Sequence, residues 1–335
     1  MSVVLTLGEP LATLTVDDVD PTVIAVHVAG AELNTAVGLA RQGIAVRWFS
    51  RSADDAFGSL VLDTLRREGI DASRVVHADG ERTGLIVKRR LDDHTVRSEH
   101  YRAGSAASRL SPAEVPGDLL DGVDLLHVTG ITPATGEGPR WAWTALVRSA
   151  AERGVPVSLD VNHRPQLVDD DGIREIVDSV IDSVDTLLCN EEEAQLLTGE
   201  ADPERALAAL VERGPRTVVL KLGRRGALVG LADGRTLRGG VWPVPLPTFP
   251  VGAGDAFNAG WIAATLAGVE PEIALPLAAW TASRVVADPG DHDGFPTAEE
   301  IAEMREALGR GERAPEPFGI DATAGFVATA VGVAR

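Results

Sequence analysis

Residues 186–222, TLLCNEEEAQLLTGEADPERALAALVERGPRTVVLKL, contain a complete strand–helix–strand unit. The apolar runs Thr186–Cys189 and Thr217–Leu222 predict short strands, and Glu204–Glu212 predicts a helix between them. A helix that connects two consecutive strands usually brings them into one parallel sheet. This unit therefore indicates an α/β fold.

The same alternation of strand and helix recurs along the chain. The helix predicted over Ala31–Arg41 places Leu33, Ala36, Val37 and Ala40 on one face, with Gly43 beyond its end. Repeated units of this kind predict a mostly parallel sheet with helices on both faces. The other predicted strands are Val3–Leu7, Ala45–Phe49, Leu125–Val128 and Pro156–Leu159, and the other predicted helices are Asp55–Glu68, Trp141–Glu152, Ala256–Ala267 and Pro271–Val286.

Two extended, polar-alternating regions depart from this pattern. Leu11–Val28 is rich in Val and Thr, and LIVKRRL and TVRSEHY flank Asp92-Asp93-His94 as in a hairpin. We predict that segments 11–28 and 82–102 form a small β layer, a lid over the edge of the main sheet. Residues 1–310 would then make one domain, with residues 311–335 as a peripheral or disordered tail.

Composition restricts the function and the partners. The 335 residues carry a formal net charge of −19, which argues against nucleic acid or an anionic membrane as a partner. An anionic substrate would therefore need local arginines or lysines. The single cysteine excludes an intrachain disulfide, and no apolar run reaches the ~18 residues of a membrane helix. The start of the chain lacks the features of a signal peptide, so we expect a cytoplasmic protein.

The most informative motif is PVGAGDAFNAG, Pro250–Gly260. Its glycines permit a tight turn, and the helical pattern that follows provides free N–H groups suited to phosphate oxygens. Asp255 stands at this helix start and has two interpretations. It is either a helix N-cap or a base that takes a proton from an attacking hydroxyl.

Two further segments have both structural and functional interpretations. The segment from Lys221 through Gly223 to Gly226 separates two apolar strands, as either a nucleotide-binding loop or a plain hairpin turn. Arg164 follows the strand ending at Leu159, where it could bind an anion bidentately or form a surface ion pair. The chain contains no Walker-type GKS or GKT, and it lacks a dinucleotide-binding fingerprint after its first strand, which sets a dehydrogenase aside.

Together these segments resemble the ribokinase-like, PfkB-type carbohydrate kinases over roughly residues 4–310. Within that family the chain is most similar to the 2-keto-3-deoxygluconate kinases. The resemblance implies a three-layer αβα sandwich with a β-sheet lid, and phosphorylation of the terminal hydroxyl of a sugar acid by Mg–ATP. The similar segments are VAGAELNTAVGLARQG, YRAGSAAS, HVTGITPA, SLDVNHR, NEEEAQLLTG, VGAGDAF and GDHDG.

The resemblance also implies roles for individual residues. Asp255 would be the base, and the backbone of Gly252, Ala253 and Gly254 would stabilise the transferred phosphoryl charge. Glu193 would organise Mg²⁺ through water, and a monovalent cation is possible. The nucleotide would lie along Asn190, Lys221, Gly223 and Gly226, and the sugar acid would contact Gly30, Asn34, His100, Arg102, Ile131, Arg164 and Asp291.

Three residues depart from the family pattern. Phe249 replaces an acid, and Ile86 and His100 replace lid tyrosines of the keto-deoxygluconate kinases. Two alternatives follow. One is a kinase for fructose, another keto-deoxy acid, an inositol-derived acid or a nucleoside. The other is a catalytically weak ligand sensor. Lid strands in this family often pair between subunits, which implies a homo-oligomer, with a dimer formed through the lid.

Overall fold

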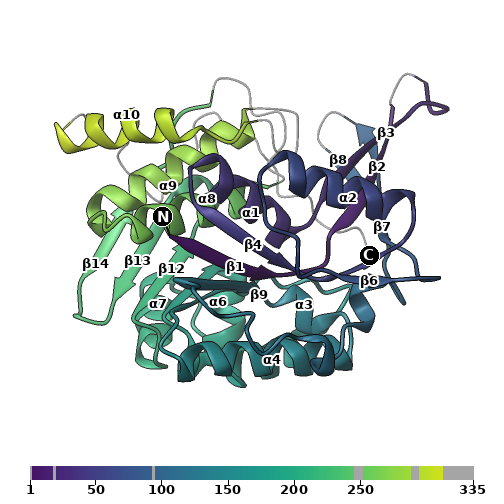
Figure 1. The fold of residues 1–335 in the computed structure, drawn as a ribbon. Coiled ribbons are helices and arrows are strands. Elements are labelled where there is room, and N and C mark those ends of the chain that lie inside the picture. The colour runs from purple at the N-terminus through teal and green to yellow at the C-terminus, as the bar shows by residue number, and fades with distance from the viewer. Residues whose placement is uncertain (1, 18–19, 93–94, 245–251, 288–293, 312–335) are drawn as a thin grey trace.

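The computed structural model describes residues 2–17, 20–92, 95–244, 252–287 and 294–311. An eight-stranded sheet crosses the molecule in the order β14-β13-β12-β11-β10-β9-β1-β4 (Figure 1). Its neighbours pair in parallel from β4 to β12, whereas β13 and β14 are antiparallel. The predicted, mainly parallel sheet is thus confirmed. Its strands are β1 Val3–Leu7, β4 Ala45–Phe49, β9 Leu125–Thr129, β10 Val157–Asp160, β11 Thr186–Asn190, β12 Thr217–Lys221, β13 Ala227–Leu231 and β14 Thr236–Gly239.

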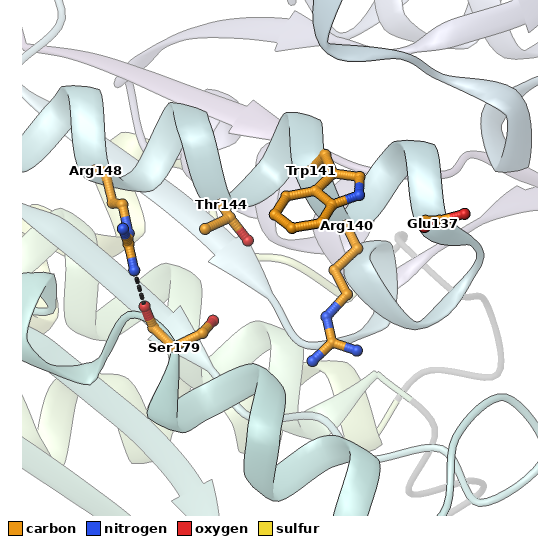
Figure 2. Close-up of a pocket in the computed structure, with 6 residues that line it drawn as sticks. All are labelled: Glu137, Arg140, Trp141, Thr144, Arg148 and Ser179. Carbon is orange, nitrogen blue, oxygen red and sulfur yellow. Dashed lines mark hydrogen bonds between the residues drawn. The ribbon is translucent and has the colours of Figure 1, made fainter.

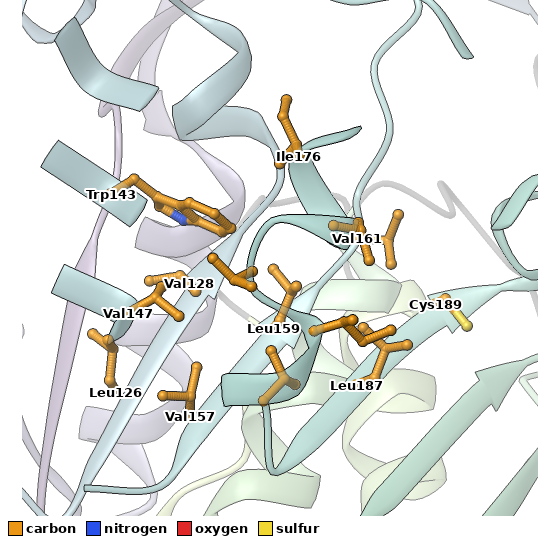
Figure 3. Close-up of a cluster of buried hydrophobic side chains, with 14 of the residues drawn as sticks. Leu126, Val128, Trp143, Val147, Val157, Leu159, Val161, Ile176, Leu187 and Cys189 are labelled. Carbon is orange, nitrogen blue, oxygen red and sulfur yellow. The ribbon is translucent and has the colours of Figure 1, made fainter. Parts of the chain in front are cut away.

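Helices cover both faces of this sheet (Figure 1). One face carries α3 Ile131–Ala134, α4 Glu137–Glu152, α5 Asp170–Asp178, α6 Glu191–Thr198 and α7 Pro203–Glu212. The other carries α1 Ala31–Arg41, α2 Ala56–Arg67, α8 Ala253–Leu266, α9 Pro271–Val286 and α10 Ala298–Gly309. Figure 3 shows the core on the α4 side, where Trp143 and Val147 pack on Leu126, Val128 and Leu159. Short 3₁₀ turns lie at Ala107–Arg109, Pro112–Glu114, Ile181–Ser183 and Gly223–Arg225.

Several helices begin earlier than their periodicity predicts. Helix α8 begins at Ala253 and not at Ala256, because Gly252 takes a left-handed conformation with φ of 83° and turns the chain into the helix. Helix α4 begins at Glu137, after Gly136. Helices α6 and α10 were not predicted, although each begins with a capping box, Asn190 with Glu193 in α6 and Thr297 with Glu300 in α10.

A second, four-stranded sheet lies beside the first in the order β3-β2-β7-β8. It consists of β2 Leu11–Val16, β3 Ile24–Ala29, β7 Gly84–Asp92 and β8 Thr95–Tyr101, and it confirms the smaller sheet expected from segments 11–28 and 82–102. The predicted hairpin is confirmed by the antiparallel pairing of β7 with β8. In this register Ile86 is directly opposite His100, so the two departures from the family's lid pattern are cross-strand neighbours. A third pair, β5 Arg51–Ala53 and β6 Val76–Ala78, completes the strands.

Some predictions concern residues outside these ranges. Asp291, Phe249 and the tail after Gly311 all lie outside the described residues. Among the helices that the structure describes, none is long and apolar enough to cross a membrane.

Candidate active site

The first turn of α8 presents free backbone N–H groups. Gly252 precedes the helix, and within the described part of the chain no side chain caps this end. The N–H of Ala256 bonds the carbonyl of Gly252 at 2.8 Å, so the N–H groups of Ala253, Gly254 and Asp255 come before the first intrahelical bond. Such a terminus is suited to an anion. Asp255 is the third residue of the helix, so the N-cap interpretation of Asp255 is wrong.

The carboxyl of Asp255 is buried beside this terminus. Its side chain is 8% exposed, and its Oδ2 accepts a 2.7 Å hydrogen bond from Nδ2 of Asn34. The pKa of Asp255 is raised to about 7, chiefly by burial and also by the negative charge of Asp160. The hydrogen bond from Asn34 and the positive charges of Arg164 and Lys221 oppose this rise. The carboxyl can therefore exchange a proton near neutral pH.

The turn at Gly30 brings Asn34 to Asp255. Gly30 has φ of 148°, and a Cβ placed there would lie 2.8 Å from the carbonyl oxygen of Glu9. Only glycine meets both conditions without strain. The N–H of Asn34 then bonds the carbonyl of Gly30 at 2.8 Å and closes the first turn of α1. The two residues predicted to contact the sugar are thus brought together, and Gly30 also has a structural reason to be glycine.

Lys221 lies beneath the first turn of α8. Its Nζ donates to Oδ1 of Asp160 at 2.9 Å and to Oδ1 of Asn258 at 3.1 Å. A Cβ added at Gly254 would lie 3.7 Å from the same Nζ. The ammonium therefore approaches the helix terminus where the N–H groups are free. Neither Asp160 nor Asn258 was predicted as a site residue, although both belong to the quoted segments SLDVNHR and PVGAGDAFNAG.

The segment from Lys221 to Gly226 forms the turn between the antiparallel strands β12 and β13. Gly226 has φ of 85°, and a Cβ there would lie 1.8 Å from the carbonyl oxygen of Gly239. Gly223 has φ of 57°, but an added Cβ would meet no heavy atom within 4 Å. The hairpin interpretation is correct for the backbone, and it explains Gly226 without a nucleotide. Nucleotide contact by this turn stays a prediction.

Arg164 follows β10 in a turn of unusual geometry. Asn162 has φ of 43°, in the left-handed region that asparagine tolerates better than most residues, and its Nδ2 donates to Oδ2 of Asp160 at 2.8 Å. Across the ranges that the structure describes, the exposed guanidinium of Arg164 has no hydrogen-bond or ion-pair partner. The alternative of a surface ion pair for Arg164 is therefore wrong for the described residues, and the nearby Asp171 pairs instead with Arg174.

Three positively charged residues, Lys88, Arg102 and Arg164, lie around His100 of the lid sheet. Lys88 and Ile86 on β7 share a face of the lid sheet with His100 on β8, because their register pairs Ile86 with His100 and Lys88 with Ser98. Partial burial lowers the pKa of His100, and the charges of Arg102, Arg164 and Lys88 lower it further. Arg164 thus acts electrostatically on both Asp255 and His100. Lys88 was missed from the sequence, although strict alternation along β7 places it beside Ile86.

Arg102, the second arginine predicted to bind a carboxylate, has a partner within the protein. Its Nε donates to Oε2 of Glu9 at 2.7 Å, and its Nη2 contacts the same oxygen. Oε1 of Glu9 accepts from the hydroxyl of Ser105 at 2.5 Å. The pair is buried, with side-chain exposures of 8% and 2%. Arg102 therefore holds the end of the lid hairpin on Glu9, and only its remaining N–H groups are available to a ligand.

The Asn190 and Glu193 pair caps α6. Oδ1 of Asn190 accepts from the N–H of Glu193, and Oε2 of Glu193 accepts from the N–H of Asn190, both at 2.8 Å. Oε1 of Glu193 accepts from the N–H of His163 at 2.8 Å. Burial and the neighbouring charge of Asp160 raise the pKa of Glu193. The described residues include no group of three or more acids, histidines or cysteines able to hold a metal ion.

Two further features are the position of Ile131 and a surface pocket beside α4. Ile131, predicted to line the sugar pocket, is buried at the start of α3, and its N–H bonds the hydroxyl of Thr129 at 3.0 Å. A surface pocket of about 340 Å³ lies on the outer side of α4, lined by Trp141, Arg140 and Arg148 (Figure 2). No predicted site residue lines this pocket, and α4 covers the sheet face opposite α8.

The αβα fold, the free helix terminus beside a buried carboxyl and the smaller sheet define an enzyme of the ribokinase-like kinase class. The model of the pfkB family carbohydrate kinases matches residues 11–298, so the chain belongs to this family. The ribokinase-like fold predicted from the sequence is confirmed.

Curated relatives and solved structures agree with this assignment. The chain is 34% identical over 284 residues to a 2-dehydro-3-deoxygluconokinase of Bacillus subtilis, covering 84% of this chain and 87% of the relative. It is 34% identical over 310 residues to the enzyme of the same name from Thermoproteus tenax, covering 90% and 94%. A PfkB protein from Polaromonas has a TM-score of 0.81 at 33% identity, covering 90% of this chain and 99% of that structure. An E. coli protein described as Ribokinase II, solved with ATP and Mg²⁺, has a TM-score of 0.83 at 25% identity, covering 91% and 99%.

Proposed function

We propose that this kinase transfers the γ-phosphoryl group of ATP to the terminal hydroxyl of 2-dehydro-3-deoxygluconate, the sugar acid also called 2-keto-3-deoxygluconate. Asp255 is the general base in this proposal. The observation that carries it is the position of Asp255, buried in the first turn of α8 with a pKa raised to about 7 and next to free N–H groups. A base whose pKa lies near the working pH suits proton removal from a hydroxyl.

The chemistry follows from these neighbours. Asp255 takes the hydroxyl proton as the acceptor oxygen attacks the γ-phosphorus, and the bond from phosphorus to the leaving oxygen of ADP breaks. The N–H groups at Gly252, Ala253 and Gly254 stabilise the charge on the transferred phosphoryl group. Asn34 holds the Asp255 carboxyl in place through its 2.7 Å hydrogen bond.

The residues present fit a nucleotide-bound magnesium ion. Mg²⁺ in kinases is held chiefly by phosphate oxygens and water, with one or two carboxylates, which matches a site without a dedicated cluster of acids among the described residues. Glu193, predicted to act through water, is the carboxylate that would assist. When bound, Mg²⁺ would reduce the negative charge of the phosphates. The nucleotide would lie along Asn190, Lys221 and Gly223.

The identity of the acceptor is inferred from the positive charges near the lid and from two of the relatives named above. Arg164, Lys88 and His100 lie near one another around the lid of a protein with a net charge of −19. A carboxylate bound by Arg164 would be stabilised there, whereas it would be repelled elsewhere on an acidic surface. The two 34% identical relatives named above are kinases of this sugar acid. Closure of the lid sheet would exclude water from the transfer.

A related acid is the second candidate. A 5-dehydro-2-deoxygluconokinase of Clostridium perfringens is 29% identical over 284 residues, and the Ile86–His100 pair differs from the tyrosines of the first group. A coupled assay of ADP release should compare both acids with fructose and a nucleoside. The proposal requires 2-dehydro-3-deoxygluconate to give the highest kcat/KM. Preference for a neutral sugar would overturn it, and tight ligand binding without turnover would favour a sensor.

Assembly and location are part of the same proposal. The outer strand β3 exposes Ile24 and Val26, and Val23 next to it is 54% exposed. An apolar edge of this kind supports a dimer formed through the lid. We further propose that the enzyme is cytoplasmic and that a monovalent cation activates it.

A further inference from the structure

We propose that Asp160 is a positioning residue for phosphoryl transfer: its carboxylate holds the Lys221 ammonium beneath the first turn of α8, where the cation faces the transferred group. Asp160 itself touches neither nucleotide nor acceptor in this proposal. The inference rests on the proposed kinase function and assigns a role to a residue that the general mechanism leaves unused.

Asp160 ends β10 and Lys221 ends β12, with β11 between them in the sheet. The lysine side chain therefore crosses β11 to reach Asp160, at 2.9 Å from Nζ to Oδ1. This path brings Nζ to 3.7 Å from the position of a Cβ on Gly254, under the helix terminus. Without Asp160, the flexible lysine would lose the partner that draws it to this point.

Asp160 is itself rigidly held. Its side chain is 3% exposed, and its Oδ2 accepts from Nδ2 of Asn162 at 2.8 Å. One carboxylate thus fixes both the ammonium and the left-handed residue that turns the chain toward Arg164. Placement of the cation and placement of the acceptor arginine are therefore linked through a single buried group.

Asn258, one turn after Asp255, is the second hydrogen-bond partner of Lys221. Its Oδ1 accepts from Lys221 at 3.1 Å, and its buried Nδ2 has no partner among the residues that the structure describes. Leaving the buried Nδ2 of Asn258 without a partner is costly. The contact of its Oδ1 with Lys221 explains why the Asn258 amide nevertheless takes this orientation. Burial of an ion pair contributes little to folding stability, because desolvation offsets the attraction. The network is therefore better explained by where it places the charge.

Asp160 also affects the base. Its negative charge helps to raise the pKa of Asp255, whereas the charges of Arg164 and Lys221 lower that pKa. The effect of Asp160 is larger than that of Lys221, so loss of the Asp160 charge should lower the pKa of Asp255 even when the lysine moves away. The charge of Asp160 also raises the pKa of Glu193 on α6. His127 on β9 lies near Asp160, and burial lowers the pKa of His127 to about 4, so this imidazole is neutral near pH 7. On α1, the buried Glu32 has a raised pKa and bonds Thr129 and Thr132.

A charge relocation tests the proposal. Asp160→Asn removes the carboxylate, and the double variant D160N/N258D returns it to the other hydrogen-bond partner of Lys221 without changing side-chain volume. An asparagine at position 160 keeps an oxygen that can accept from Asn162, so the turn toward Arg164 should be retained. We therefore expect Asp160→Asn to lower kcat at least ~10-fold, with KM for the acceptor changed less than ~3-fold. It should also move the acid limb of the kcat/KM profile to lower pH. The double variant should regain at least half of the lost kcat on a logarithmic scale and return the limb toward its original pH.

The controls separate position from stability and from substrate identity. Asp185→Asn removes a carboxylate beside the opposite end of β10: Asp185 directly precedes β11, and its Oδ2 accepts from the N–H of Val157 at 2.9 Å. It should change neither kcat nor the acid limb. Isothermal titration calorimetry measures the affinity for Mg–ATP without an acceptor. Asp160→Asn should weaken Mg–ATP binding several-fold. Whichever acceptor supports turnover can be used, so a wrong sugar acid would not affect the result.

Three outcomes would overturn the inference. They are a kcat within threefold of wild type in Asp160→Asn, an acid limb that does not move, and a folded double variant that recovers nothing. If thermal melting shows that Asp160→Asn does not fold, the double variant alone tests the proposal. A kcat of the double variant within tenfold of wild type supports the proposal, and a larger loss contradicts it.

Discussion

Nδ2 of Asn34 donates a 2.7 Å hydrogen bond to Oδ2 of Asp255, joining the first turn of α1 to the first turn of α8. The contact spans 221 positions of sequence. It orients the carboxyl, and it partly opposes the rise in pKa that burial causes. One hydrogen bond thus affects both the geometry and the ionisation of the proposed base.

The pH dependence of the reaction should report this carboxyl. Asp255 acts as a base only when ionised, so kcat/KM should rise with pH through about 7, the raised pKa. Asn34→Ala removes a hydrogen bond that lowers the pKa, so the acid limb should move to higher pH. A pH–rate profile of both proteins measures the shift. An acid limb near pH 4 in wild type would contradict the raised pKa of Asp255.

Stability should change with pH in a related way. Because the folded pKa of Asp255 lies above its ordinary value of 3.8, ionisation of the buried carboxyl costs stability as pH rises from about 4 through about 7. Each pKa unit corresponds to about 1.4 kcal/mol. Asp255→Asn lacks this cost, so its Tm should exceed that of wild type at pH 8 and approach it near pH 4. Melting curves at both pH values test this, and a lower Tm at pH 8 would contradict it.

Arg164 should determine affinity for the acceptor and not stability. A charge-assisted hydrogen bond contributes ~1.5–3 kcal/mol, so Arg164→Ala should weaken acceptor binding by roughly 10- to 150-fold. Arg164→Lys should also be impaired, since an ammonium cannot reproduce the planar fork. The control is an acceptor whose carboxylate is reduced to an alcohol. Wild type should discriminate against it far more than Arg164→Ala does. Equal use of acid and alcohol by wild type would exclude the clamp.

Arg102 should behave differently from Arg164. Arg102→Ala leaves Glu9 buried without its cation, which should cost about 3–5 kcal/mol of unfolding free energy. The double variant Arg102→Met with Glu9→Met should recover much of this loss, since it removes both charges. Chemical denaturation measures each. If Arg102→Ala keeps wild-type stability and loses only acceptor affinity, the arginine is a ligand first, as the family resemblance implied.

The turn after β12 offers a matched pair of glycines. Gly223→Ala adds a methyl group with no heavy atom within 4 Å, so its main structural effect is the strain of a positive φ. We expect it to raise KM for ATP more than KM for the acceptor. Gly226→Ala would bring its methyl group to 1.8 Å from the carbonyl oxygen of Gly239, so it should lower Tm instead. A Gly223→Ala effect on the acceptor alone would contradict the nucleotide assignment.

Much of the fold could be predicted from local patterns. Strand–helix alternation predicted the parallel sheet, and the alternating polar strands predicted the second sheet. The start of α8 was misplaced because Gly252 enters the helix from a left-handed conformation, which periodicity does not reveal. Helix α6 is short, and its capping box at Asn190 was interpreted as ligand chemistry.

The site was harder to predict because its partners are distant in sequence. Asp255 was predicted from its motif, but its partner Asn34 depends on the packing of α1 against α8. The pairing of Arg102 with Glu9 could not be predicted from the sequence, because Glu9 lies 93 positions away in a segment without a recognisable motif. Asp160 and Asn258 were present in quoted motifs, yet only the path of Lys221 across β11 shows what they contact.

The most direct measurement is the turnover of Asp255→Asn. Asparagine keeps the size of the side chain and an oxygen that can accept from Asn34, but it cannot take a proton at neutral pH. The account predicts that kcat falls at least ~10²-fold at pH 8, with Mg–ATP affinity unchanged and Tm no lower than wild type. A folded Asp255→Asn enzyme with near wild-type kcat would contradict the assignment of Asp255 as the base.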